Sequence, residues 1–252
     1  MDQADLPLRD VTEEARRLIH ATDEHGLRVR LLGGGAIGMH IHDPVPDQLR
    51  RQYGDLDVAI RSRDSQALAT LLPTLGYISD QRFNALHGEK RFLFHDGANE
   101  RKLDVFIGTF SMCHTMNLED RIPEEGMTLE VTDLLLTKLQ VVQLTMKDRT
   151  DALVLLRDHE MTSGPTPDGI DLGRVAAVCG NDWGWSTTVL DNLPKLTLAA
   201  RELLDSPTAR RIVDKCRELA AEIGTCPKSR RWRLRAVVGR RMEWYMLPEE
   251  VG

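Results

Sequence analysis

The sequence lacks the segments that would place it in a membrane or carry it out of the cell. Its 252 residues contain no run of about 18 apolar residues, so we expect no transmembrane helix. The N-terminal stretch MDQADLPLRDVTEEARR is polar and acidic and contains no apolar signal region. We therefore expect a cytoplasmic protein that has no membrane partner.

Cysteine is scarce and widely spaced. The four cysteines are Cys113, Cys179, Cys216 and Cys226, and they form no C-x-x-C pair. This spacing argues against a cysteine zinc site and against a disulfide framework, and it fits a reducing compartment. Internal repeats and low-complexity tracts are also missing. With 41% hydrophobic and 29% charged residues, the composition is that of an ordinary globular protein.

The net charge is unevenly distributed along the chain. The formal net charge is −6, but residues 228–241, KSRRWRLRAVVGRR, contain seven basic residues and no acidic one. A globally acidic chain is not suited to nonspecific nucleic-acid binding, whereas a local basic segment can contact phosphates. If 228–241 forms one helix, Arg230, Arg233, Arg240 and Arg241 gather on one face around Val237.

The residue pattern predicts a mixed α/β half followed by a helical half. Apolar periodicity predicts helices at 11–26, 35–42 and 65–77 and strands at 27–32, 55–60, 90–95 and 101–108, the last two joined as a hairpin. Helices follow at 132–145, with Thr132 as N-cap, and at 147–159. Residues 163–169 read as a linker, so we expect a catalytic core at 1–130, completing helices at 131–162 and a helical domain at 163–252.

The glycine run in RLLGGGAIGMH matches a dinucleotide-binding fingerprint through Gly33, Gly35 and Gly38. That fingerprint requires a long helix after the glycines and an acidic residue at the end of the next strand. Here the helix must stop near Asp43-Pro44, and the acidic residues open the strand DLDVAI instead of closing it. The glycines therefore serve another kind of site.

Three aspartates offer that other chemistry. Asp55 and Asp57 lie two residues apart on a strand, so their side chains share a face. Carboxylates this close repel one another unless a cation lies between them. Asp104, in KLDVFIG, supplies a third carboxylate from another strand. Three such oxygen ligands suit Mg²⁺ or Mn²⁺, and backbone N–H groups at Gly34 and Gly35 can approach a triphosphate.

In this order, these motifs resemble the nucleotidyltransferase superfamily with the DNA polymerase β-like catalytic fold. The elements are LLGGGAIG, DLDVAI and KLDVFIG, followed by DLLLTKLQ and KDRTD, which resemble motifs of abortive-infection toxin nucleotidyltransferases. The likeness covers residues 28–158. It implies an α+β fold, with a nucleotidyltransferase-like mixed sheet, flanking helices and a helical C-terminal half. A toxin-like role is a further implication.

The resemblance also implies functions for charged residues outside the carboxylates. The lysine that matches Lys138 faces the triphosphate in the resembled family, and Asp148 becomes an active-site carboxylate or a hydrogen-bond anchor, with Arg149 beside it. From its position before the strand FLFH, the pair Lys90 and Arg91 can meet nucleotide phosphates. Each of these residues can equally be an ordinary surface charge.

The expected reaction is metal-dependent transfer of a nucleoside monophosphate from an NTP, such as ATP, to a hydroxyl. RNA, such as a tRNA end, and an amino-sugar or lincosamide small molecule both stay open as acceptors. A nucleotidyltransferase-like domain that only binds a partner is the non-catalytic alternative. The sequence leaves the oligomeric state open.

Histidine and tryptophan add no further site at this level. His40 and His42 are two residues apart and so do not share a helix face, which argues against a metal pair there. Trp183 and Trp185 read as packing residues of the helical half.

Overall fold

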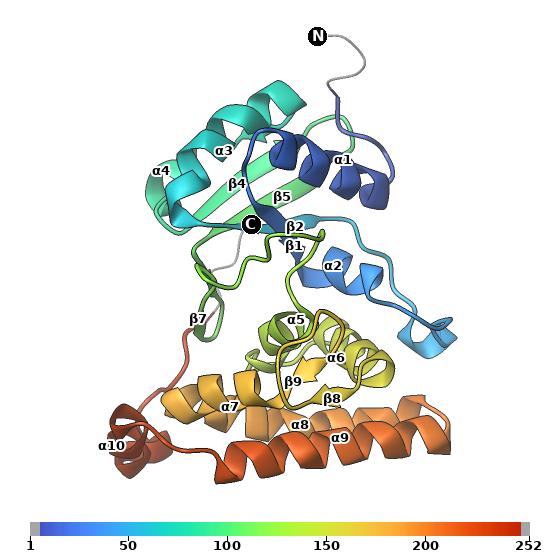
Figure 1. Cartoon of the computed structure of the whole chain (residues 1–252), viewed down its shortest axis with the longest axis vertical. Coiled ribbons are helices and arrows are strands. Elements are labelled where there is room, and N and C mark those ends of the chain that lie inside the picture. The colour runs from blue at the N-terminus through green and yellow to red at the C-terminus, as the bar shows by residue number, and fades with distance from the viewer. Residues whose placement is uncertain (1–5, 248–252) are drawn as a thin grey trace. The chain divides into compact units, whose positions relative to one another are not determined.

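The computed structural model describes residues 6–247, so the chain ends included in our predicted domains lie outside the described residues (Figure 1). It divides into two compact units. The first comprises Met1–Met39, Gln52–Phe110 and Thr115–Leu129; the second comprises His40–Arg51, Ser111–His114 and Glu130–Gly252.

A five-stranded mixed sheet forms the core of the first unit, in the order β1-β2-β5-β4-β3. The pairing of β2 with β5 is parallel, and the other three pairings are antiparallel. Helices flank this sheet and a helical second half follows, so the predicted α+β class is confirmed. The elements up to residue 129 are α1 (Val11–Glu24), β1 (Val29–Leu32), α2 (Gly33–Met39), η2 (Asp47–Leu49), β2 (Leu56–Ile60), η3 (Ser62–Asp64), α3 (Ser65–Leu71), η4 (Leu72–Leu75), β3 (Ile78–Ser79), α4 (Gln81–His87), β4 (Arg91–Asp96), β5 (Arg101–Ile107), β6 (Thr109–Ser111) and β7 (Thr115–Asn117).

The predicted hairpin is present as β4 and β5, joined by residues 97–100. Asp96 organises its turn, because the carboxylate accepts hydrogen bonds from the backbone N–H groups of Ala98 and Asn99. Arg101 then closes the turn by an ion pair of 2.6 Å with the same carboxylate. Asp96 is buried, so this pairing also compensates its charge inside the protein.

The second unit is built mostly of helices. Three of its helices begin with an aspartate as N-cap. The side chains of Asp171, Asp182 and Asp205 each accept a hydrogen bond from a backbone N–H group in the first turn. Part of the acidic excess is therefore used to start helices. The elements after residue 129 are α5 (Val131–Leu139), α6 (Met146–Asp158), β8 (Met161–Thr162), β9 (Ile170–Asp171), α7 (Leu172–Asn181), α8 (Trp183–Leu203), α9 (Ser206–Thr225), α10 (Arg230–Val238) and η5 (Gly239–Arg241).

Several local predictions are wrong. Thr132 does not cap α5: it lies inside the helix, which begins after Glu130. Residues 163–169 are not a boundary between the units, since both flanks of this loop belong to the second unit and β8 pairs with β9 in parallel. The basic segment is not one helix either, because Gly239 adopts φ +59° after α10.

Two other expectations about the helices can be compared with the structure. Trp185 is buried against the ring of His114, as expected for a packing residue, with the ring centroids 5.5 Å apart. In the part of the chain that the structure describes, no helix is both long and apolar enough to cross a membrane.

Candidate active site

The register of the sheet brings two of the predicted carboxylates together. In the parallel pairing of β2 with β5, Asp57 lies directly opposite Asp104. Paired residues on neighbouring strands project to the same face, with the strands about 4.8 Å apart. The sequence could place each aspartate on a strand, but only the pairing makes Asp57 and Asp104 neighbours.

Asp55 lies one residue before β2, at the edge of the same cluster. Its Oδ1 accepts a hydrogen bond of 3.3 Å from the backbone N–H of Lys102, which fixes the carboxylate against the start of β5. Because Asp55 is two residues before Asp57, both side chains point to the same face. Asp55 is exposed while Asp57 is half-buried, so the cluster opens to solvent on the Asp55 side. Asp55, Asp57 and Asp104 are called the carboxylate cluster below.

Arg91 belongs to this cluster as a direct partner of Asp104. Its Nε and Nη2 atoms lie 2.8 and 2.7 Å from Oδ1 of Asp104. The guanidinium also lies over the ring of Phe106, 5.0 Å from its centroid, and 5.5 Å from that of Phe83. These contacts fix Arg91 in place, and because both bonds reach Oδ1, Oδ2 is the oxygen that Arg91 does not use.

Burial raises the pKa of Asp104 above its ordinary value, against the opposing effect of the Arg91 charge, and the nearby Asp55 raises it further. The carboxylate therefore binds a proton more readily than an exposed aspartate does. A group of this kind, held by one cation and close to a second carboxylate, is suited to accept a proton.

Gly33 is the glycine that touches the cluster. Its φ of +68° is a backbone conformation that other residues rarely adopt, and a Cβ atom built there would lie 2.0 Å from Oδ2 of Asp57. At Gly35, by contrast, the nearest atom to such a Cβ is the backbone oxygen of Asp55 at 4.0 Å. Our sequence analysis emphasised Gly34 and Gly35 and missed this role of Gly33. Its place directly before them, at the end of β1, was the available signal.

Lys90 does not share the contact of Arg91 with Asp104. Its side chain is exposed directly before β4, whereas the adjacent Arg91 turns to Asp104. Consecutive residues of a strand project to opposite faces, so the side chains of Lys90 and Arg91 point in different directions. Arg91 acts on a carboxylate, and contact of Lys90 with phosphate stays a prediction.

The remaining predicted residues gather in the second unit, around a carboxylate that we did not select. Asp151 is 0% exposed in its side chain, and its Oδ2 lies 2.9 Å from Nζ of Lys138 and 2.6 Å from Nη1 of Arg51. Two cations thus offset one buried charge. The available signal was the position of Asp151 directly before the apolar run ALVLL in α6.

Asp148 and Arg149 have local partners at the start of α6. Asp148 forms a capping box with Thr145, in which each side chain bonds the backbone N–H of the other. Nζ of Lys138 is 3.7 Å from Asp148, a longer approach than its contact with Asp151. Arg149 is half-buried, and its guanidinium contacts the sulfur of Met146 at 2.8 Å. A helix cap therefore accounts for Asp148 without any ligand.

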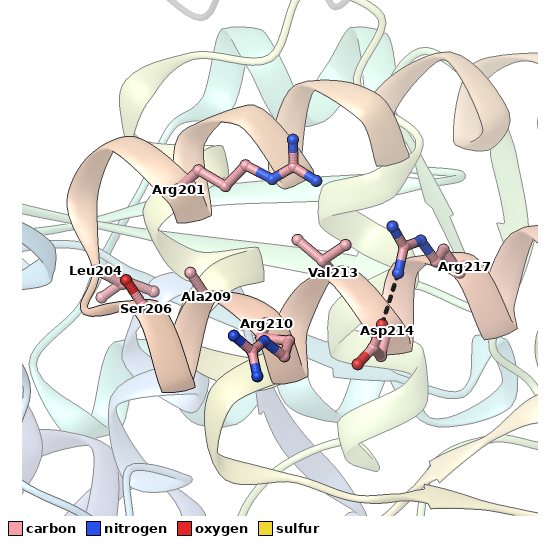
Figure 2. A pocket seen from close by; sticks show the side chains of 8 residues that line it. All are labelled: Arg201, Leu204, Ser206, Ala209, Arg210, Val213, Asp214 and Arg217. Carbon is pink, nitrogen blue, oxygen red and sulfur yellow. Dashed lines mark hydrogen bonds and ion pairs between the residues drawn. The ribbon is translucent and has the colours of Figure 1, made fainter.

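A surface hollow of about 420 Å³ lies elsewhere in the second unit, between α8 and α9. Figure 2 shows Arg201 above it and Arg210 and Arg217 below, with Arg217 paired to Asp214 at 2.8 Å. None of the predicted site residues lines this hollow.

Comparison with known proteins gives structural likeness and no sequence match. No protein-family model matches the chain. No curated protein matches it either. Among solved structures, the chain is similar to the lincosamide antibiotic adenylyltransferase LnuA with lincomycin bound, at 13% identity and a TM-score of 0.44, over 59% of this chain and 98% of that one.

Two further solved structures are similar over different shares of the chain. The antibiotic-resistance factor ANT(2'')-Ia is 14% identical with a TM-score of 0.41, over 57% of this chain and 81% of that one. An antigenic nucleotidyltransferase-like protein from Paracoccidioides brasiliensis is 12% identical with a TM-score of 0.43, over 89% of this chain and 96% of that one. At these identities and scores, the likeness decides no substrate. These three structures are proteins to which the chain is similar.

Proposed function

We propose that this chain is a divalent-metal-dependent nucleotidyltransferase, which moves a nucleoside monophosphate from an NTP to a hydroxyl acceptor. The observation that carries the proposal is the pairing of Asp57 with Asp104 across two parallel strands, with Asp55 on the same face. Three carboxylates on one sheet face repel one another unless a cation binds among them.

The donor set fits Mg²⁺ or Mn²⁺. The cluster offers carboxylate oxygens and no sulfur or imidazole, and Arg91 contacts Asp104 through Oδ1. Asp55 and Asp57 would hold the ion, and Asp104 would complete its ligands. When bound, the ion supplies Lewis-acid activation and neutralises charge on the phosphates.

In the reaction, the acceptor oxygen forms a bond to the α-phosphorus as the bond to the bridging oxygen of pyrophosphate breaks. We assign to Asp104 the proton that leaves the acceptor hydroxyl, because this carboxylate lies opposite Asp57 on the face that would hold the ion. Arg91 holds Asp104 in position for that step. The backbone N–H groups of Gly34 and Gly35 would orient the triphosphate.

The roles proposed for residues outside the carboxylate cluster depend on the resemblance of the sequence motifs. We retain Lys138 as the group that offsets phosphate charge, with Lys90 and Arg149 as further phosphate contacts and Asp148 as an anchor. In the structure, Lys138 is bound to Asp151. If Lys138 contacts the nucleotide, a Lys138→Met variant should lower the transfer rate more than an Asp151→Asn variant, with both assayed well below their melting temperatures.

The test is transfer of label from each of four α-labelled NTPs, with Mg²⁺, Mn²⁺ or EDTA. One arm supplies total RNA as acceptor and the other a panel of amino-sugar and lincosamide antibiotics. We expect transfer in one arm, with ATP tested first as donor, and none in EDTA. Transfer to neither acceptor class at high enzyme concentration, together with no metal-dependent NTP binding, would contradict the proposal and favour a domain that binds a partner without catalysis.

The matched variants are Asp57→Asn and Asp47→Asn. The first should abolish metal-dependent transfer, and in EDTA it should melt no lower than the unchanged protein, because it removes one of several repelling charges. The second changes an aspartate that is 84% exposed and pairs with Arg50, so it should leave transfer unchanged. A lower melting temperature of Asp57→Asn in EDTA would show that this carboxylate has a structural role.

A further inference from the structure

Three histidines and one aspartate gather within the second unit. His40 follows the end of α2, His159 is the C-cap of α6, and Asp168 lies in the loop between β8 and β9. One potential ligand atom of each of these three lies within 4.8 Å of the others. His42 adds a fourth side chain, with its Nε2 3.2 Å from Oδ2 of Asp168.

The ring of His159 has oxygen atoms on both sides. Nδ1 lies 2.9 Å from the backbone oxygen of Asp168 and 3.2 Å from its Oδ1, while Nε2 lies 3.0 Å from the backbone oxygen of His40. All of these neighbours are acceptors. A neutral imidazole has one donor and one acceptor nitrogen, so it can donate to only one side. The side chain of His159 is 0% exposed, and a metal ion at the acceptor nitrogen would complete the arrangement.

The arrangement around Nε2 is the one that a metal-binding histidine shows. A ligating imidazole commonly donates its other N–H to a backbone carbonyl, which fixes the tautomer and directs the lone pair at the metal. His159 does this if Nε2–H bonds the oxygen of His40. Nδ1 is then the nitrogen that faces Asp168.

The backbone holds the histidine segment firmly at the end of α6. The N–H of His42 donates to Asp158 at 3.2 Å, and Nη2 of Arg157 donates to the backbone oxygen of Asp43 at 2.8 Å. On the other side, Nζ of Lys215 in α9 donates to the backbone oxygen of His159 at 2.7 Å. The ligand groups are thus placed by contacts that need no metal.

The sequence argument considered only His40 and His42 and missed His159 and Asp168. His40 and His42 lie after the end of α2 and not within it, so a helix face does not decide whether their side chains come together. Of the two, only His40 belongs to the group of potential ligands with His159 and Asp168. The absence of a metal pair made by His40 and His42 themselves stays a prediction.

We propose that His40, His159 and Asp168 form a zinc site in which His42 orients the aspartate. Zinc ligands 2.0–2.2 Å from the ion lie about 3.4 Å apart in a tetrahedron. The His159–Asp168 distance is already 3.2 Å and the His40–Asp168 distance is 3.8 Å. The partial exposure of Asp168, 58%, leaves room for a water molecule as the fourth ligand. Imidazole and carboxylate suit zinc, whereas Mg²⁺ prefers oxygen ligands alone.

The site joins three segments that are distant in sequence, so its effect is on the stability of the second unit. A ligand that binds only the folded state raises its stability according to concentration and affinity. Zinc would hold residues 40–42 and the 163–169 loop against the end of α6. This role is independent of the proposed transfer reaction.

The test titrates the full-length, metal-stripped protein with Zn²⁺ against a chromophoric chelator, and with Co²⁺ for its visible spectrum. With excess Mg²⁺ to fill the carboxylate cluster, we expect one Zn²⁺ per chain, a tetrahedral Co²⁺ spectrum without a thiolate charge-transfer band, and a higher melting temperature with zinc. His40→Gln and Asp168→Asn should weaken zinc binding by roughly 100-fold or more. His42→Gln should weaken it by about 10–100-fold, as expected for a partner that orients a ligand.

The matched controls are His20→Gln, on an α1 side chain that is 76% exposed, and the double variant Asp55→Asn, Asp57→Asn. Both should bind zinc like the unchanged protein, and the second separates this site from the carboxylate cluster. Three results would overturn the proposal. They are zinc binding unchanged by His40→Gln, a Co²⁺–thiolate band that assigns the metal to cysteine, and no zinc binding with a melting temperature lowered by Asp168→Asn. The last result would show that Asp168 and the histidines form an ion pair and not a metal site.

Discussion

Replacing Gly33 by alanine tests whether the glycine run serves the carboxylates. The new methyl group would lie 2.0 Å from Oδ2 of Asp57 and 2.9 Å from its Cγ, distances at which the atoms overlap. Asp57 must therefore turn away or the backbone must shift. The φ of +68° adds strain of its own, about 1–2 kcal/mol for a residue that carries a Cβ.

These two effects have separate readouts. Backbone strain of about 1–2 kcal/mol should lower the melting temperature by roughly 2–8 °C. Displacement of Asp57 should lower metal-dependent transfer, by about 100-fold for a shift near 1 Å. The apparent Mg²⁺ affinity should fall together with the rate, because the variant moves a ligand of the ion.

Gly35→Ala is the matched control. Its Cβ has nothing closer than 4.0 Å, and alanine in place of glycine within a helix stabilises by about 0.5–1 kcal/mol. We therefore expect the two variants to change stability in opposite directions. Our explanation is refuted if Gly33→Ala keeps both its melting temperature and its transfer rate. Gly35→Ala is compared for stability alone, because the backbone N–H of Gly35 is one of the proposed triphosphate contacts.

Three further predictions concern other parts of the chain. Asp151→Asn should cost roughly 3 kcal/mol in urea unfolding, because it leaves two partly buried cations without their counterion; a cost near zero would contradict the ion-pair geometry. Burial lowers the pKa of His114 to about 4. Because an unfolded histidine titrates near ~6.5, the unfolded state binds more protons between these values. The free energy of unfolding should therefore fall as the pH drops through this window, by up to about 3 kcal/mol, and His114→Gln should flatten the profile. In α10, Arg230, Arg231 and Arg233 are exposed. If RNA is the acceptor, replacing all three by glutamine should reduce the log–log salt slope of RNA binding by about 0.7–0.9 per lost phosphate contact. An unchanged slope would argue against contact of α10 with RNA.

The structure changes which arginines of the basic segment the RNA-binding test should replace. We expected Arg240 to share a helix face with Arg230 and Arg233. Instead, Arg240 lies in η5 after the turn at Gly239 and pairs with Asp191 at 2.7 Å. It therefore serves the second unit itself, and the RNA test uses the arginines of α10 alone.

The sequence by itself determined the elements that local pattern controls. The alternation of apolar residues located β2, β4 and β5, and the hairpin between β4 and β5 followed from its turn residues. Asp55 and Asp57 could be assigned to one face because a strand has a fixed period of two. These inferences depend only on residues that are close in sequence, so they require no tertiary information.

Tertiary structure decided every pairing between distant residues. The opposition of Asp57 to Asp104 depends on the strand order β1-β2-β5-β4-β3, in which β5 pairs with β2 although β3, β4, α3 and α4 lie between them in the chain. Likewise, His159 and Asp168 meet His40 through folding of the whole second unit. A local pattern fixes the direction of a side chain relative to its own backbone. The side chain's partner, and hence its charge environment and its chemistry, depends on which distant segment the packing brings against it.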